Sequence, residues 1–133
     1  MSNASGRGSA SIYYLTISTG IGADVDFGEI LDFVAMDPAT DSIMLYIEGL
    51  KDARRFMSAL RAAARTKPVV IMKSGRHEQG SRAAVSHTGA LVGSDAVFDS
   101  ALRRAGALRV DDFTDFFATA KTLDSGVRPS GSR

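Results

Sequence analysis

The stretch SIMLYIEGLKDARRFMSALRAAARTKPVVIM, Ser42–Met72, decides the fold. It begins and ends with short apolar runs, SIMLYI and PVVIM, which are typical of strands covered on both faces. Between them, apolar residues recur at helical spacing from Asp52 to Arg65, and arginines take the other face. The inward set is Phe56, Ala59, Leu60 and Ala63, and the outward set is Arg54, Arg55, Arg61 and Arg65. We therefore expect a strand–helix–strand unit whose arginine stripe faces solvent.

The same alternation continues on both sides of this unit. The further predicted elements, in chain order, are a strand at Ser11–Thr19, a helix from its cap Asp26 to Met36, a helix from Ser94 or Asp95 to Ala105 with Gly106 after it, a strand at Leu108–Val110, and a helix from Asp111 or Asp112 to Leu123. Phe113, Phe116 and Phe117 are spaced for the buried face of that last helix. The chain therefore predicts an α/β fold: a parallel sheet with helices on both faces.

Composition narrows the class of protein. The chain has 133 residues, of which 44% are hydrophobic and 23% charged, as expected for one soluble globular domain. A net charge of +1 gives no field that would attract nucleic acid or a membrane surface, so neither partner is expected. The absence of cysteine excludes disulfides and thiolate metal sites. We expect a cytoplasmic protein.

Three regions are expected along the chain. Residues 1–10 are rich in Gly and Ser and are interpreted as a flexible lead or a cloning remnant. Residues 11–123 form the domain. Residues 124–133 have the Ser, Gly, Pro and Arg composition of a linker-like tail.

The run Ser86-His87-Thr88-Gly89-Ala90-Leu91 is the strongest candidate for chemistry. In parallel sheets, chemistry collects at the carboxyl ends of the strands, and both this loop and Glu48 are expected there. A neutral His87 imidazole can take a phosphoryl group on nitrogen while the Glu48 carboxylate fixes its other N–H. Gly49 would let the backbone turn sharply after Glu48, and Gly89 would allow close approach to the phosphate.

Simpler interpretations of these residues stay open. His87 can equally be a loop histidine that makes a local hydrogen bond, and Glu48 can be the cap of the helix after Lys51. The cations of the loop, Lys73, Arg76 and Arg82, suit a phosphate but are also ordinary solvated charges. His77 is expected to be an exposed loop residue. No metal site is predicted, because neither histidine has cysteines or an acidic cluster around it.

Two segments resemble a known family. They are KSGRHEQGSRAAVSHTGALVGSDAVFDSALRRAGALRVDD, Lys73–Asp112, and ADVDFGEILDFVAMDPATDSIMLYIEGLKDARRF, Ala23–Phe56. Both resemble the NDP-forming, or ADP-forming, acyl-CoA synthetases, which are related to the alpha subunit of succinyl-CoA synthetase. The resemblance extends to bacterial protein lysine acetyltransferases that fuse this region to a GNAT domain. In many of those the histidine is replaced, so His87 favours the synthetases.

The resemblance implies a flavodoxin-like CoA-ligase domain. In the implied cycle, acyl-CoA and phosphate give an acyl phosphate, a histidine takes the phosphoryl group, and an ATP-grasp domain passes it to ADP. His87 would be that histidine and Glu48 the acid that contacts its ring. The phosphate loop would consist of Ser86, Thr88, Gly89 and Ala90. CoA and ADP or ATP with Mg²⁺ are expected in the complete enzyme, and no cofactor is assigned to this chain itself.

The resemblance also implies partners. CoA-binding and ATP-grasp domains or subunits are absent from this chain, and so is the family's first strand–helix unit before Ser11. We therefore expect a partial domain that does not turn over alone, whose open sheet edge would pair into a homo-oligomer. Two alternative functions remain: a non-catalytic, acyl-CoA-responsive module of a GNAT-type lysine acetyltransferase, and an inactive scaffold.

Overall fold

A computed structural model describes residues 26–74 and 95–125 of the chain. The elements, in order, are α1 (Phe27–Met36), β1 (Ile43–Ile47), α2 (Ala53–Ala64), β2 (Val69–Lys73), α4 (Asp95–Ala105), β3 (Leu108–Val110) and α5 (Phe113–Asp124). Each corresponds to an element expected from the sequence, with bounds close to the predicted ones. The strand expected at residues 11–19 lies outside the described residues.

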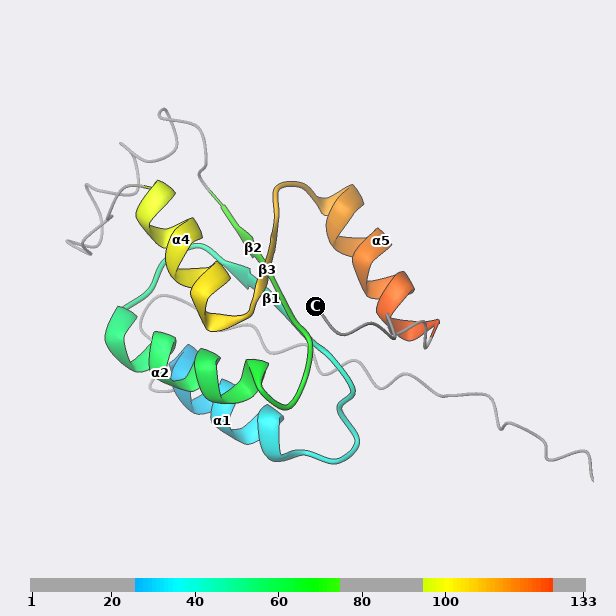
Figure 1. Ribbon diagram of the computed structural model, residues 1–133, viewed down its shortest axis with the longest axis horizontal. Coiled ribbons are helices and arrows are strands. Elements are labelled where there is room, and N and C mark those ends of the chain that lie inside the picture. The colour runs from blue at the N-terminus through cyan, green and yellow to red at the C-terminus, as the bar shows by residue number, and fades with distance from the viewer. Residues whose placement is uncertain (1–25, 75–94, 126–133) are drawn as a thin grey trace, which may run out of the picture.

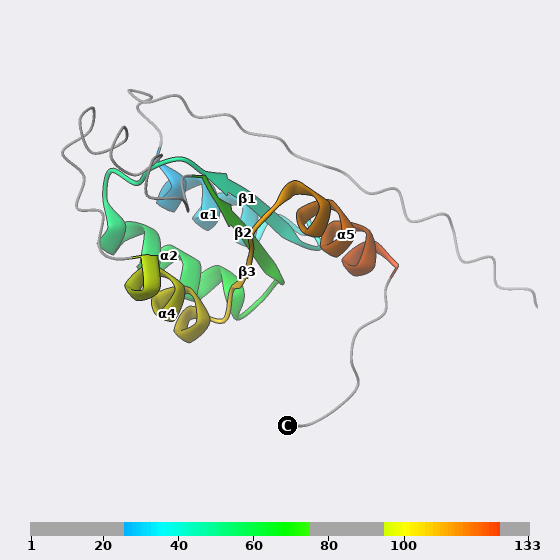
Figure 2. The ribbon, with the colours of Figure 1, turned by 90° about the horizontal axis from the view of Figure 1, so that it is seen from above.

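The strands form one parallel sheet in the order β1-β2-β3. Ile43 pairs with Val69 in the first ladder, and Val70 pairs with Leu108 in the second. Helices α1, α2 and α4 lie on one face of the sheet, and α5 lies on the other, as Figures 1 and 2 show. The predicted parallel sheet with helices on both faces is therefore confirmed.

Aspartate caps explain where three of the helices begin. In each, the carboxylate accepts a hydrogen bond from the backbone N–H three residues on, which satisfies a donor that the first turn leaves free. The pairs are Asp26 with Glu29 at 2.9 Å, Asp52 with Arg55 at 2.9 Å, and Asp112 with Asp115 at 2.8 Å. Helix α4 ends before Gly106, whose φ of +87° favours glycine.

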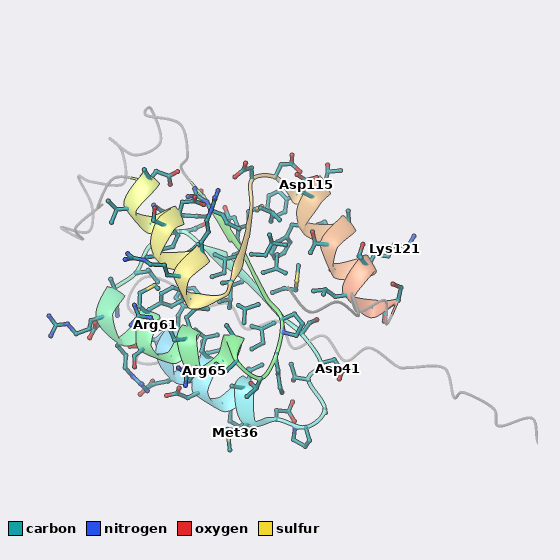
Figure 3. All side chains as sticks on the ribbon, viewed as in Figure 1. Met36, Asp41, Arg61, Arg65, Asp115 and Lys121 are labelled. Carbon is teal, nitrogen blue, oxygen red and sulfur yellow. The ribbon has the colours of Figure 1, made fainter. Side chains whose placement is uncertain are left out.

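The two faces of the sheet bury separate apolar clusters. On the first, the predicted inward residues of α2 are all buried, and they pack with side chains of α1, α4 and the strands. The outward arginines are exposed, and Figure 3 labels Arg61 and Arg65 among them. Arg55 is tied to Asp32 of α1 by an ion pair of 2.6 Å. On the second face, Val70, Met72 and Val110 pack against Phe116.

Two expectations about the second face were wrong. Strand β1 is not covered on both sides in the described part of the chain, because α5 packs over β2 and leaves Tyr46 41% exposed. The three phenylalanines do not all enter the core. Only Phe116 is buried, whereas Phe113 is 54% and Phe117 66% exposed. Phe113 instead lies beside Tyr46, with 5.6 Å between ring centroids. Within residues 26–74 and 95–125, no helix is long and apolar enough to cross a membrane.

The loop from α1 to β1 is tied to the start of β2 through Lys67. Its Nζ donates to the Val34 carbonyl at 2.8 Å and also to the Asp37 carbonyl, so it satisfies acceptors at the end of α1. The Asp37 carboxylate accepts hydrogen bonds from the Thr40 hydroxyl at 2.6 Å and the Ala39 N–H at 3.1 Å. These two hydrogen bonds hold the pKa of Asp37 below its ordinary value of 3.8.

We expect Lys67→Met to destabilise the fold by about 1 kcal/mol, because two carbonyls at the end of α1 lose a charged donor. Urea unfolding followed by circular dichroism measures this change. Arg61→Met is the matched control, since Arg61 is an exposed cation of α2. Equal loss in both variants would show that Lys67 contributes only its charge.

Asp37 predicts a pH dependence with a defined sign. Because folding lowers the pKa of Asp37, its stabilising effect is complete above the unfolded value near 3.8 and is lost as the pH falls through the folded value. Asp37→Asn should therefore have a lower Tm than the parent at pH 7, and the difference should shrink below pH 3.8. A Tm difference that stays constant down to pH 2.5 would contradict this assignment.

Candidate functional site

Glu48 lies at the carboxyl edge of the sheet, directly after β1. The parallel register places Ile47 opposite Lys73, and the Ser74 N–H extends the ladder by donating to the Ile47 carbonyl at 2.9 Å. Ser74 is the last described residue before the segment that contains His87. The Glu48 side chain is exposed. The exposed Glu48 carboxylate therefore directly follows Ile47, the end of β1, which is hydrogen-bonded to Ser74 just before this segment.

The capping alternative for Glu48 is excluded by the geometry of α2. Asp52, not Glu48, accepts the hydrogen bond from the Arg55 N–H. Within the described ranges, no hydrogen bond or ion pair occupies the Glu48 carboxylate. Gly49 does not have the special conformation expected of it. Gly106 has the only positive φ among the glycines described, and a Cβ added at Gly49 would meet no atom within 4 Å.

The expected histidine and phosphate loop lie outside the described residues. This applies to Ser86, His87, Thr88, Gly89 and Ala90, and also to His77. What the structure does fix is the place where their segment leaves and rejoins the described fold. The segment 75–94 follows Ser74, just after the end of β2, and precedes Asp95 at the start of α4. These two points are close together, because Lys73 Nζ lies 3.8 Å from Asp95 Oδ1. Both ends of the segment thus lie at one edge of the sheet.

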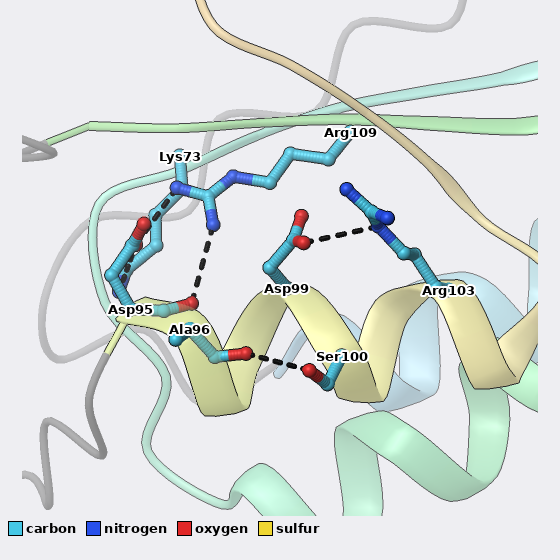
Figure 4. Close-up of polar contacts among 7 residues, drawn as sticks. All are labelled: Lys73, Asp95, Ala96, Asp99, Ser100, Arg103 and Arg109. Carbon is cyan, nitrogen blue, oxygen red and sulfur yellow. Dashed lines mark hydrogen bonds and ion pairs between the residues drawn. The ribbon is translucent and has the colours of Figure 1, made fainter.

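An arginine that the sequence did not single out lies beside these ends. The Arg109 side chain, from β3, is only 5% exposed, and its Nη2 lies 2.8 Å from Asp95 Oδ1 (Figure 4). Lys73 shares this carboxylate, so the cation that was expected to face a phosphate or solvent is paired within the fold. The signal in the sequence was weak: one charged residue inside the three-residue strand Leu108–Val110. Pairing with Asp95 depends on tertiary contacts.

Nowhere in residues 26–74 and 95–125 do three or more His, Cys, Asp or Glu residues gather in a way that could hold an ion. Among the described residues, this edge offers the exposed Glu48 carboxylate and the paired cations Lys73 and Arg109.

Comparisons with known proteins agree with this architecture. Residues 5–123 match the family described as the succinyl-CoA ligase like flavodoxin domain. The alpha subunit of ADP-forming acetate–CoA ligase I from Pyrococcus furiosus is 40% identical over 115 residues, which cover 86% of this chain and 25% of that protein. The ADP-forming 4-hydroxybutyrate–CoA ligase of Nitrosopumilus maritimus is 35% identical over 86% of this chain and 17% of its own length.

Solved structures of a CoA synthetase resemble the fold of this chain. The apo form of the dinucleotide forming acetyl-coenzyme A synthetase 1 from Ca. Korarchaeum cryptofilum matches with a TM-score of 0.76 and 36% identity, covering 88% of this chain and 25% of that one. Its complex with phosphate and ADP matches with a TM-score of 0.72. This chain spans about a quarter of the length of the Pyrococcus furiosus subunit. Because the family match includes nearly all of the described fold, the chain belongs to the succinyl-CoA ligase like flavodoxin domain family.

Proposed function

We propose that this chain is the phosphohistidine-carrying domain of an ADP-forming acyl-CoA ligase. His87 would relay a phosphoryl group between an acyl phosphate and ADP, and Glu48 would orient its ring. The observation that carries the proposal is the exposed Glu48 carboxylate, which has no partner among residues 26–74 and 95–125. It directly follows Ile47, whose carbonyl accepts the Ser74 N–H where the chain enters the segment of His87. The relatives support the reaction class, since those compared are named ADP-forming CoA ligases.

The chemistry uses few groups of this chain. The Glu48 carboxylate accepts the N–H of one His87 ring nitrogen, which leaves the lone pair of the other nitrogen free to attack phosphorus. The N–P bond forms as the P–O bond of the acyl phosphate breaks, and the acyl carboxylate leaves. A terminal oxygen of ADP then attacks the same phosphorus, the N–P bond breaks, and ATP forms with the neutral imidazole restored.

Backbone amides suit the phosphate in this scheme. Ser86, Thr88, Gly89 and Ala90 surround His87 in the sequence, and their small side chains allow close approach of the main chain. CoA and ADP with Mg²⁺ are proposed as substrates of the complete enzyme, held by CoA-binding and ATP-grasp domains or subunits. We propose these as the partners of this chain.

The experiment measures transfer to His87 directly. The chain is incubated with 32P-labelled acetyl phosphate, and separately with γ-32P ATP, Mg²⁺ and an ATP-grasp partner. We expect a label that is stable in base, labile in acid and absent from His87→Gln. Glu48→Gln should slow labelling by about tenfold or more, because the ring loses the acceptor that fixes its tautomer. Its Tm should match that of the parent, since the Glu48 side chain is exposed and unpaired in the described fold.

His77→Gln is the matched control, because it removes the only other histidine of the chain. It should label at the parent rate. Label that survives His87→Gln would contradict the assignment of the carrier, and unchanged labelling of Glu48→Gln would contradict the role given to the acid.

A further inference from the structure

Four side chains meet where α4 begins, and we call them the Asp95 cluster: Lys73, Asp95, Phe98 and Arg109. Arg109 Nη2 donates to Asp95 Oδ1 at 2.8 Å, and Nη1 lies 3.5 Å from the Asp95 carbonyl oxygen. Lys73 Nζ approaches the same Oδ1 at 3.8 Å, and Figure 4 shows both cations turned toward this one residue. The Phe98 ring centroid lies 4.8 Å from Lys73 Nζ and 5.9 Å from Arg109 Cζ.

The burial of Arg109 lowers the stability that this position could give to the fold. Its side chain is 5% exposed, and its Nε is buried with no hydrogen-bond partner in the described structure. Burial of a guanidinium costs desolvation free energy, and an unpaired N–H adds to that cost. An apolar side chain of similar length would fill the same space without either cost. The burial of this cation therefore suggests a role besides stability.

The position of the cluster suggests what that role is. Lys73 ends β2, one residue before Ser74, and Asp95 begins α4. Apart from Ser74, the residues between them are the segment 75–94, which contains His87. The Asp95 carboxylate, which follows the segment, is thus paired with Lys73, which precedes the segment, and with Arg109 from β3. The cluster therefore fixes the separation of the two points between which this segment is held.

We propose that Arg109 is a positioning residue for the phosphoryl transfer at His87. In this role it acts through Asp95. By fixing the start of α4 against the end of β2, it sets the geometry in which His87 meets Glu48. This inference rests on the proposed function in so far as His87 is the carrier, whereas the role of the cluster in holding the two ends can be tested without it.

The guanidinium is suited to this task in a way that an ammonium is not. Its two Nη atoms reach the side chain and the main-chain carbonyl of the same residue, which restrains both the rotamer and the backbone of Asp95. Lysine at position 109 would keep the charge but present a single nitrogen. Stability and positioning can therefore be separated by comparing lysine and methionine at this position.

The test compares Arg109→Met, Arg109→Lys and Ala105→Gly in the full chain. Ala105 is buried at the opposite end of α4, so Ala105→Gly weakens the same helix away from the cluster. We expect Arg109→Met to slow labelling of His87 by acetyl phosphate about tenfold, with the half-saturating concentration unchanged. Arg109→Met should keep a Tm at least as high as that of the parent, because an apolar side chain avoids the cost of the buried cation. Arg109→Lys, which presents a single nitrogen to Asp95, should also label slowly. Ala105→Gly should lose Tm and label at the parent rate.

A second readout does not depend on phosphorylation. The Ser74 amide, bonded to the Ile47 carbonyl, should exchange with solvent about tenfold faster in Arg109→Met and at the parent rate in Ala105→Gly, as measured by NMR. Parent-rate labelling in Arg109→Met, labelling rates that follow Tm across all variants, or unchanged Ser74 exchange would each overturn the proposal. If the parent chain takes no label, the proposed function fails and the Ser74 exchange alone decides the role of the cluster.

Discussion

The parallel pairing of β1 with β2 is the constraint on which the rest of the arrangement depends. Parallel strands cannot be joined by a tight turn, so the chain must return through α2, and the apolar stripe of that helix is buried as it crosses the sheet. The same pairing makes the two strands end together. The hydrogen bond from Ser74 to Ile47 continues it beyond β2 and brings the residue after β1, Glu48, to the point where the chain enters segment 75–94.

The sheet is covered unequally, and this explains where apolar surface remains. Three helices pack on the first face, so side chains as large as Phe56 and Leu60 are almost completely buried there. Of the helices in the described ranges, only α5 packs on the second face, where it contacts β2. A helix is too narrow to cover a three-stranded sheet, since neighbouring strands lie about 4.8 Å apart and a helix is about 10 Å wide. Tyr46 and Phe113 are therefore left partly exposed side by side.

Two carboxylates at the carboxyl edge have opposite environments. Asp95 is shared by Lys73 and Arg109, and its position is restrained by both. Glu48 is exposed and has no ionic or hydrogen-bonding partner in the described ranges. A paired carboxylate holds structure, whereas an unpaired one at the end of a strand can accept a proton or orient a ring. This contrast gives the two acids separate roles in our proposals, one in positioning and one in chemistry.

The sequence by itself determined the order of elements, their approximate bounds, the aspartate caps and the inward face of α2, because these depend on local spacing and on hydrogen bonds within a few residues. Only the tertiary structure decided that Tyr46 and Phe113 stay exposed and that Arg109 is buried against Asp95. These outcomes depend on how many helices cover each face and on which strand ends lie side by side. Such contacts join residues far apart in the chain, so no pattern of neighbouring residues encodes them.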